Sequence, residues 1–145
     1  MNANPLAAYK ETRVKTASPA QLLVMLYDEA LKQCDIAVDY LKGDIKKHPQ
    51  NIEKVNAALG KVQDILTELM ASLDFDAGGE IAQNLFSLYV WFGREILDAN
   101  LTKEVDRVCA VRAMLAELRG AWAEAGAKMQ GGVGSQAPVG VNIAG

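Results

Sequence analysis

Apolar side chains recur along residues 18–42 at steps of three and four, the spacing that lines up one face of an α-helix. This stripe consists of Leu23, Tyr27, Ala30, Cys34, Ala37 and Leu41. In front of it, Ser18 can act as an N-cap, Pro19 suits the first helical position, and Gln21 can close a capping box. The pattern predicts a helix that begins at Ser18 and stops near Gly43.

Three further segments show the same spacing. Asn51 is placed to cap the second helix, Gly78-Gly79 marks the turn before the third, Asn100 closes the third, and Thr102 is placed to cap the fourth. Their apolar positions are Ile52, Val55, Leu59, Val62, Leu66, Leu69 and Leu73, then Ile81, Leu85, Leu88, Phe92 and Ile96, then Val105, Val108, Val111, Leu115, Leu118 and Trp122. Long amphipathic helices with short connections and no strand pattern predict an all-α fold, an antiparallel up-and-down four-helix bundle.

The two ends of the chain differ from the bundle. Residues 1–17 place Leu6 and Tyr9 on one side of a short helical turn, which is too short to be stable unless it docks on something. Beyond Met129 the sequence is rich in glycine and free of charge, so it buries too little to offset the entropy of ordering. We therefore expect an N-terminal segment at 1–17, the bundle at 18–129 and a disordered tail at 130–145.

Composition narrows the classes of partner. The net charge is -3 with a pI near 5.2, and acidic and basic residues are interspersed, so no basic stripe is present to neutralise a nucleic acid backbone. The chain starts without a signal-peptide pattern and contains no run of about 18 apolar residues, so we expect a cytoplasmic protein that does not insert into a membrane. Cys34 and Cys109 lie in apolar helical patterns, and we expect free, buried thiols.

Catalytic chemistry has no candidate residues in this sequence. His48 is the only histidine, and the following Pro49 pushes it out of helical geometry, so we expect a solvated loop residue. A di-metal bundle needs Glu-x-x-His motifs, and a nucleophilic serine or cysteine needs a base, neither of which one loop histidine supplies. Asp74, Asp76 and Glu80 suit the N-terminus of the third helix. We therefore expect neither an enzyme nor a metal or cofactor.

The first and third helices carry more apolar residues than a bundle core needs. The surplus residues are Leu22, Val24, Met25 and Leu26 on the first helix, and Phe86, Val90 and Trp91 on the third. A surface helix normally keeps a polar face, so the surplus predicts a cover formed by the N-terminal segment, a second copy of the chain or a partner. A core that simply uses wide apolar arcs is an equal alternative.

Three blocks of the sequence resemble the FliS family of flagellar secretion chaperones. They are TASPAQLLVMLYDEAL from Thr16 to Leu31, LDFDAGGEIAQNLFSLYVWFGREILDAN from Leu73 to Asn100, and ELRGAWAEA from Glu117 to Ala125. The resemblance covers most of the chain, from Tyr9 to about Ala125, in the family's order and spacing. Glu29, Phe86 and Val90 depart from it, because the family often has glycine at the first position and polar or acidic residues at the other two.

The resemblance implies a cytoplasmic export chaperone. It would bind the C-terminal region of flagellin, prevent premature polymerisation and assist delivery to the flagellar export apparatus, whose export gate is an implied partner. Leu6 and Tyr9 would form an N-terminal cap over part of the client surface. Whether a regulator or co-chaperone also binds stays open. The alternative is a structural or self-assembling bundle that uses its apolar surface for oligomerisation; we expect a monomer or a weak homo-oligomer.

Specific roles follow for a few residues. The candidates for client binding are Tyr27, Asn84, Phe86, Tyr89 and Val90, although the two tyrosines are equally compatible with the core and Asn84 with a solvated position. Architectural roles are expected for Ser18, Pro19, Gly78, Gly79, Glu80 and Trp122, and Arg119 and Trp122 would hold the fourth helix to the bundle.

Overall fold

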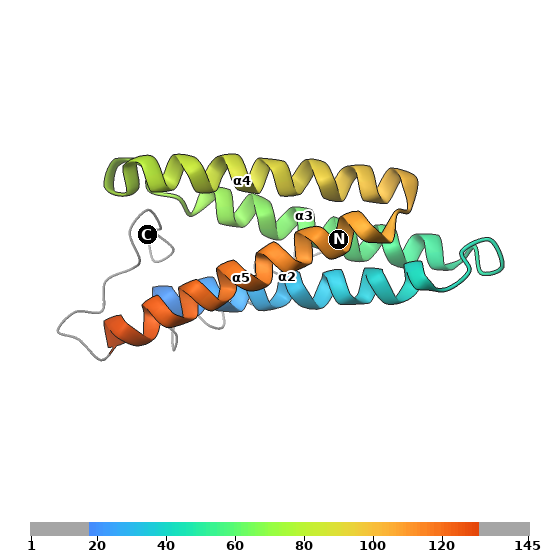
Figure 1. Cartoon of the computed structure of the whole chain (residues 1–145), viewed down its shortest axis with the longest axis horizontal. Coiled ribbons are helices and arrows are strands. Elements are labelled where there is room, and N and C mark those ends of the chain that lie inside the picture. Colours follow the sequence, from blue (N-terminus) through green and yellow to red (C-terminus); the bar gives the residue numbers. More distant parts are fainter. Residues whose placement is uncertain (1–17, 131–145) are drawn as a thin grey trace, which may run out of the picture.

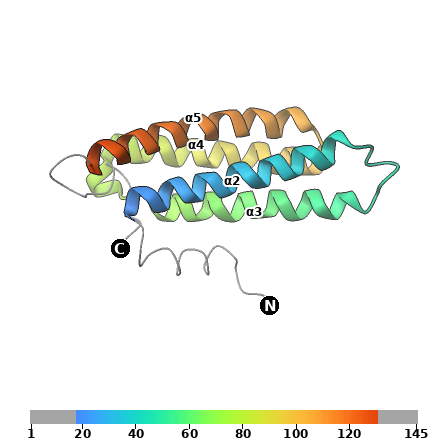
Figure 2. The same cartoon turned by 90° about the horizontal axis from the view of Figure 1, so that it is seen from below.

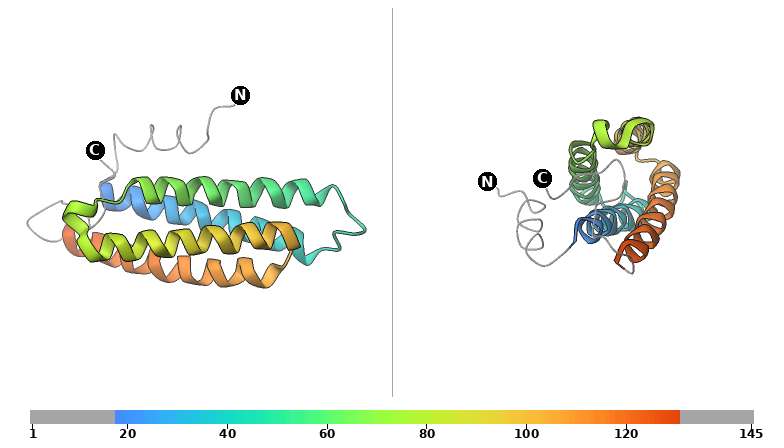
Figure 3. Two further views of the ribbon diagram at one scale, coloured as in Figure 1. Left: turned by 90° about the horizontal axis from the view of Figure 1, so that it is seen from above. Right: turned by 90° about the vertical axis from the view of Figure 1, so that its left-hand side faces the viewer.

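The computed structural model describes residues 18–130, which form four helices packed side by side (Figure 1). These helices are α2 (Pro19–Lys42), α3 (Asn51–Ala71), α4 (Phe75–Thr102) and α5 (Val105–Gln130). Each helix packs on the next along the chain and α5 returns to α2, so the end-on view places them at the corners of a square (Figure 3). The predicted all-α, up-and-down four-helix bundle is confirmed. Leu6, Tyr9 and the tail beyond Gln130 lie outside the described residues.

The start of α2 is set by a complete capping box. The Ser18 hydroxyl accepts a hydrogen bond from the Gln21 backbone N–H at 3.1 Å, and the Gln21 side-chain carbonyl accepts one from the Ser18 N–H at 2.8 Å. Pro19 occupies the first turn, where its missing N–H costs nothing. Local sequence alone therefore defines this helix end.

Two predicted caps are wrong because other residues end or begin those helices. The α3 helix begins at Asn51 itself, and Gln50 occupies the N-cap position without a side-chain hydrogen bond. Thr102 is the last residue of α4, which extends past Asn100, and the Thr102 hydroxyl donates back to the Asp98 carbonyl at 2.9 Å. It is thus part of the preceding helix and does not cap α5.

Lys103 ends α4. Its backbone is left-handed, with φ 59°, which stops the helix. Its ammonium Nζ donates to the Asn100 backbone carbonyl at 2.6 Å, to Asn100 Oδ1 at 2.7 Å and to Asn56 Oδ1 on α3 at 2.7 Å. Partial burial lowers the pKa of Lys103. A cation at this position suits the negative end of the helix dipole, so one side chain both caps α4 and ties it to α3.

The predicted turn at Gly78-Gly79 lies inside α4 as a kink. The helix starts earlier because Asp74 Oδ1 accepts a hydrogen bond from the Ala77 N–H at 3.0 Å, and Gly79 then adopts φ 52° and ψ −123°, a conformation available essentially to glycine. Across the kink, the rings of Phe75 and Phe86 meet edge to face with centroids 5.9 Å apart. The glycine therefore positions an aromatic pair.

Most predicted core positions are buried. The fully buried residues with the largest side chains are Tyr27, Tyr89, Phe92, Leu23, Leu26, Leu59, Ile65, Leu66, Leu69, Ile96, Leu115 and Val55. Ile52 and Ile81 are exposed, contrary to the predicted stripes, because Ile52 is in the first turn of α3 and Ile81 lies at the edge of the buried face of α4. Cys34 is buried, and desolvation raises the pKa of its thiol to about 12. Cys109 is exposed, so the prediction of two buried thiols is half wrong.

A pair of buried hydroxyls crosses the middle of the bundle. The phenol oxygens of Tyr27 on α2 and Tyr89 on α4 are 2.7 Å apart, and both residues are fully buried. Burial raises the pKa of both phenols; for Tyr27, the Tyr89 hydroxyl and the Trp122 side chain on α5 oppose that rise. The buried Nε1 of Trp122 makes no hydrogen bond of normal geometry within residues 18–130. Three helices thus bring polar groups to one point in the core.

The α5 helix runs antiparallel to α2, with its C-terminal end beside the start of α2 (Figure 2). Two ion pairs and a close contact mark the register of the two helices. Arg112 binds Asp35 at 2.7 Å, and seven residues further on Arg119 binds Asp28 at 2.8 Å, so the antiparallel helices stay in step. A Cβ on Gly126 would come within 3.0 Å of the Ala20 Cβ, so the glycine allows the close approach. Exposed pairs of this kind contribute only about 0–1 kcal/mol each, so they select register more than they add stability.

Replacing one tyrosine of the buried pair by phenylalanine should leave the other hydroxyl without its partner. Tyr27→Phe or Tyr89→Phe should each lower the free energy of unfolding by about 1–3 kcal/mol, and the double variant should cost clearly less than the sum. Urea unfolding measures all three. Tyr40→Phe, at a half-buried tyrosine on α2, is the matched control and should change stability by less than about 0.5 kcal/mol. Strict additivity would show that the two hydroxyls do not interact.

Adding a methyl group to the kink glycine should strain the backbone. Gly79→Ala should lower the free energy of unfolding by about 1–3 kcal/mol, although its Cβ would meet no neighbouring atom. Gly60→Ala, in the middle of α3 and equally open, should instead raise stability by up to about 1 kcal/mol through helix propensity. Thermal unfolding of both variants makes the comparison, and a shift of the same sign in both would contradict the role of the kink.

Candidate functional site

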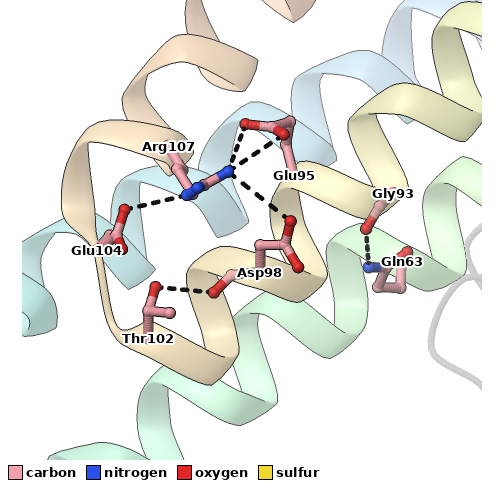
Figure 4. A network of polar contacts seen from close by, with 7 residues as sticks. All are labelled: Gln63, Gly93, Glu95, Asp98, Thr102, Glu104 and Arg107. Carbon is pink, nitrogen blue, oxygen red and sulfur yellow. Dashed lines mark hydrogen bonds and ion pairs between the residues drawn. The ribbon is translucent and has the colours of Figure 1, made fainter.

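One flank of α4 carries a continuous apolar stripe, which we call the α3-side stripe. It consists of Phe86, Val90, Leu97 and Leu101, spaced so that all lie on one helix face together with Gly93. Gly93 identifies the flank, because its carbonyl accepts a hydrogen bond from Gln63 Nε2 of α3 at 2.7 Å (Figure 4). Phe86 is 41%, Leu97 53% and Leu101 74% exposed, and Val90 is half-buried.

The closest approach of the two helices along this stripe depends on Gly93. A Cβ there would come within 3.3 Å of Gln63 Oε1, so any other residue would push the amide away. Gln63 is on the same face of α3 as Asn56, Gly60 and Thr67, which are small or uncharged. These α3 side chains are uncharged, and the Lys103 ammonium bound to Asn56 brings one positive charge to the end of the stripe near Leu101.

The stripe continues past the kink to the start of α4. Phe75 is 46% exposed and packs its ring against Phe86, so the two aromatic rings form one exposed apolar end. Edge-to-face contacts of this kind hold both rings in place. A partner therefore meets a preformed aromatic surface at this end of the bundle.

The opposite flank of α4 carries a second stripe, which we call the α5-side stripe. Its members alternate at steps of three and four: Ile81, Asn84, Leu88, Trp91, Glu95 and Asp98. The last two identify the flank, because Arg107 of α5 lies 3.2 Å from Glu95 and 3.8 Å from Asp98 (Figure 4). Apolar residues occupy one end of this stripe and carboxylates the other.

The structure separates the five residues predicted to bind a client. Tyr27 and Tyr89 are fully buried and bonded to each other, so they belong to the core and are unavailable to a partner. Phe86 and Val90 lie together on the α3-side stripe, whereas Asn84 lies on the α5-side stripe. These positions divide the candidates between three environments.

Sequence reasoning missed Leu97 and Leu101, although both are more exposed than Phe86. The signal was present, because each continues the spacing of Phe86 and Val90 along α4.

Glu29, another departure from the family pattern, supports a buried polar group. Its carboxylate Oε2 accepts a hydrogen bond from Gln33 Nε2 at 2.8 Å, one turn along α2, and Gln33 is almost fully buried. An amide buried without a partner would cost about 1–3 kcal/mol. Glu29 therefore has a structural role in this chain.

The surfaces of α4 offer apolar contact area and hydrogen-bonding edges. Between Ser18 and Gln130, no group of histidine, cysteine, aspartate and glutamate side chains is arranged to hold a metal ion. Over the same residues, no helix is both long and apolar enough to span a membrane.

Comparison with known proteins agrees with this architecture. The family model for the flagellar protein FliS matches residues 2–129. The flagellar secretion chaperone FliS of Salmonella typhimurium is 35% identical over 77% of this chain and 79% of its own length, and that of Escherichia coli K12 is 31% identical over 79% and 80%. The Bacillus subtilis chaperone is 29% identical over 84% of this chain and 86% of its own. The chain belongs to the FliS family of flagellar secretion chaperones.

Proposed function

We propose that this chain binds the C-terminal region of flagellin in the bacterial cytosol, prevents its premature polymerisation and assists its delivery to the export apparatus. Membership of a flagellar secretion chaperone family supports the general role of an export chaperone. The observation that carries the finer proposal is the exposed α3-side stripe, Phe86, Val90, Leu97 and Leu101, on a bundle whose core is already filled. A surface of that kind suits helix-in-groove recognition and needs no catalytic group.

The length of the stripe matches an ordered client helix. Phe86 and Leu101 are separated by fifteen residues of α4, so the stripe runs for about 22 Å, or roughly four helical turns. A client segment that folds on binding loses about 2–5 kcal/mol to ordering. Fully burying one leucine or phenylalanine returns only about 1.5–3 kcal/mol, so several residues of the stripe must be covered at once.

The side chains that flank the stripe indicate the client's chemistry. Asn56, Gln63 and Thr67 of α3 provide amide and hydroxyl groups. The bases nearby are Lys103, whose ammonium binds Asn56, and Arg94 on the outward face of α4. A client helix with an apolar face bordered by uncharged polar residues would leave no buried charge unpaired. In this proposal the segment with Leu6 and Tyr9, outside the described residues, competes with the client for the stripe as a cap. The apparent affinity for the client then falls in proportion to the fraction of chaperone that is left uncapped.

Calorimetric titration with the C-terminal segment of flagellin from the same bacterium tests the proposal. We expect saturable one-to-one binding with a negative heat-capacity change, because apolar surface is buried. A variant that lacks residues 1–10, and with them the cap, should bind the segment at least as tightly. Absence of binding by both proteins would overturn the proposed client and leave self-assembly as the use of the stripe.

Serine substitutions locate the interface. Phe86→Ser combined with Leu97→Ser should weaken client binding by about tenfold or more, since each change removes apolar area from the contact. The matched control is Ile81→Ser, which makes the same kind of change at an equally exposed position on the opposite flank of α4. It should leave client binding unchanged. Equal affinities for the double variant and the unmodified chain would place the client elsewhere.

A further inference from the structure

We propose that the α5-side stripe of α4 is a second docking surface, for a basic amphipathic helix from a protein other than the flagellin client. It carries an exposed apolar patch of its own: Ile81 is 52% and Trp91 41% exposed. The two stripes occupy opposite flanks of α4, as shown by the contact of Gly93 with α3 and of Glu95 with α5. One helix bound to the α3 side therefore cannot also cover Trp91.

The neighbouring face of α5 leaves room beside this patch. The helices are antiparallel, so moving one turn back along α4 from Glu95 corresponds to one turn forward along α5 from Arg107. That places Trp91 and Leu88 at the level of Ala110 and Met114. Ala110 is exposed and short, so the larger indole stands clear of its neighbour on α5. An incoming helix can therefore contact the Trp91 ring and the Met114 side chain together.

Carboxylates surround the patch. The acidic residues on these faces of α4 and α5 are Glu80, Glu95, Asp98, Glu104, Asp106, Glu117 and Glu124. The bases are Arg94, Arg107 and Lys128, and Lys128 is paired with Glu124 at 3.3 Å. Three carboxylates already share Arg107: its Nε is 3.0 Å from Glu104, and its Nη1 is 3.2 Å from Glu95 and 3.8 Å from Asp98. Glu80 and Glu117 are exposed and form no ion pair with any residue from 18 to 130. The face is left with an excess of negative charge.

Charge complementarity commits this surface to a basic occupant. Lysine or arginine residues beside an apolar stripe would reach the unpaired carboxylates, and a cation above the Trp91 ring would gain a cation–π contact. An acidic helix would meet like charge on both sides. The α3-side stripe has no comparable acidic border, so the two flanks select different chemistry and can be occupied at the same time.

A synthetic peptide pair provides the probe. The basic peptide is about 18 residues long, or five helical turns, with leucines at helical spacing and lysines elsewhere; its counterpart replaces every lysine by glutamate. Fluorescence anisotropy of the labelled peptides should show saturable binding of the basic peptide that weakens as salt is added, and no binding of the acidic one. Equal binding of both peptides, or of neither, would overturn the proposal.

Variants assign the binding to the α5-side stripe. Trp91→Ala combined with Ile81→Ser should weaken binding of the basic peptide by about tenfold or more. Phe86→Ser combined with Leu97→Ser should leave its binding unchanged. Glu117→Lys should weaken it, and Asp39→Lys, the same charge change at an exposed position on α2, should have a smaller effect. Unchanged urea midpoints show that each variant is folded. Equal effects of the two lysine variants would show that the peptide responds only to the net charge of the protein, and would overturn the proposal.

The flagellin segment separates this inference from the proposed function. The Trp91→Ala, Ile81→Ser variant should bind that segment as the unmodified chain does. If this variant also fails to bind the flagellin segment, the α5-side stripe belongs to the client surface and the inference of a separate partner is wrong. If the flagellin segment fails to bind any form of the protein, the proposed client fails, while the peptide result on Trp91 still decides this inference.

Discussion

The hydrogen bond between the Tyr27 and Tyr89 hydroxyls requires the same rotation of α4 as the burial of Leu85, Phe92 and Ile96, and the exposed surfaces follow from that rotation. The two residues belong to helices at diagonal corners of the bundle, so their contact passes through its centre. With Tyr89 directed inward, Phe86 and Val90 turn toward the α3 flank, and Leu88 and Trp91 toward the α5 flank. A small rotation of α4 would break the pair and bury one stripe while exposing the other further.

Most of the fold could be predicted because its signals are local and periodic. The capping box at Ser18 and Gln21 uses residues within one turn, and the alternating apolar positions name most of the core. They miss Leu22 and Leu26, which were predicted to be surplus to the core but are buried in it. Several of the errors lie at helix ends, where more than one residue could end or begin the helix. Thr102 resembles an N-cap in sequence, yet α4 includes it and ends at the left-handed Lys103, whose ammonium binds Asn100 and, on another helix, Asn56.

The candidate site was harder to predict. Periodicity showed that α4 carries surplus apolar residues, but it could not show which would remain uncovered. Tyr89 and Phe86 both look like contact residues in the sequence, and only packing against α2 distinguishes the buried phenol from the exposed ring. Asn84 is seven residues, or two helical turns, from Trp91, which puts both on one flank of α4. The helix that this flank faces could be assigned only from the ion pairs of Arg107 and the Gln63–Gly93 hydrogen bond.

The Lys103 ammonium gives the bundle two unequal ends. At its own end, a single side chain links α3 to the last turn of α4, and only two residues connect α4 to α5. At the other end, α4 begins with a glycine kink and an exposed aromatic pair. A partner that approaches the bundle therefore meets a polar, cross-linked end at Lys103 and an apolar aromatic end at Phe75, so the two ends of one helix offer different chemistry.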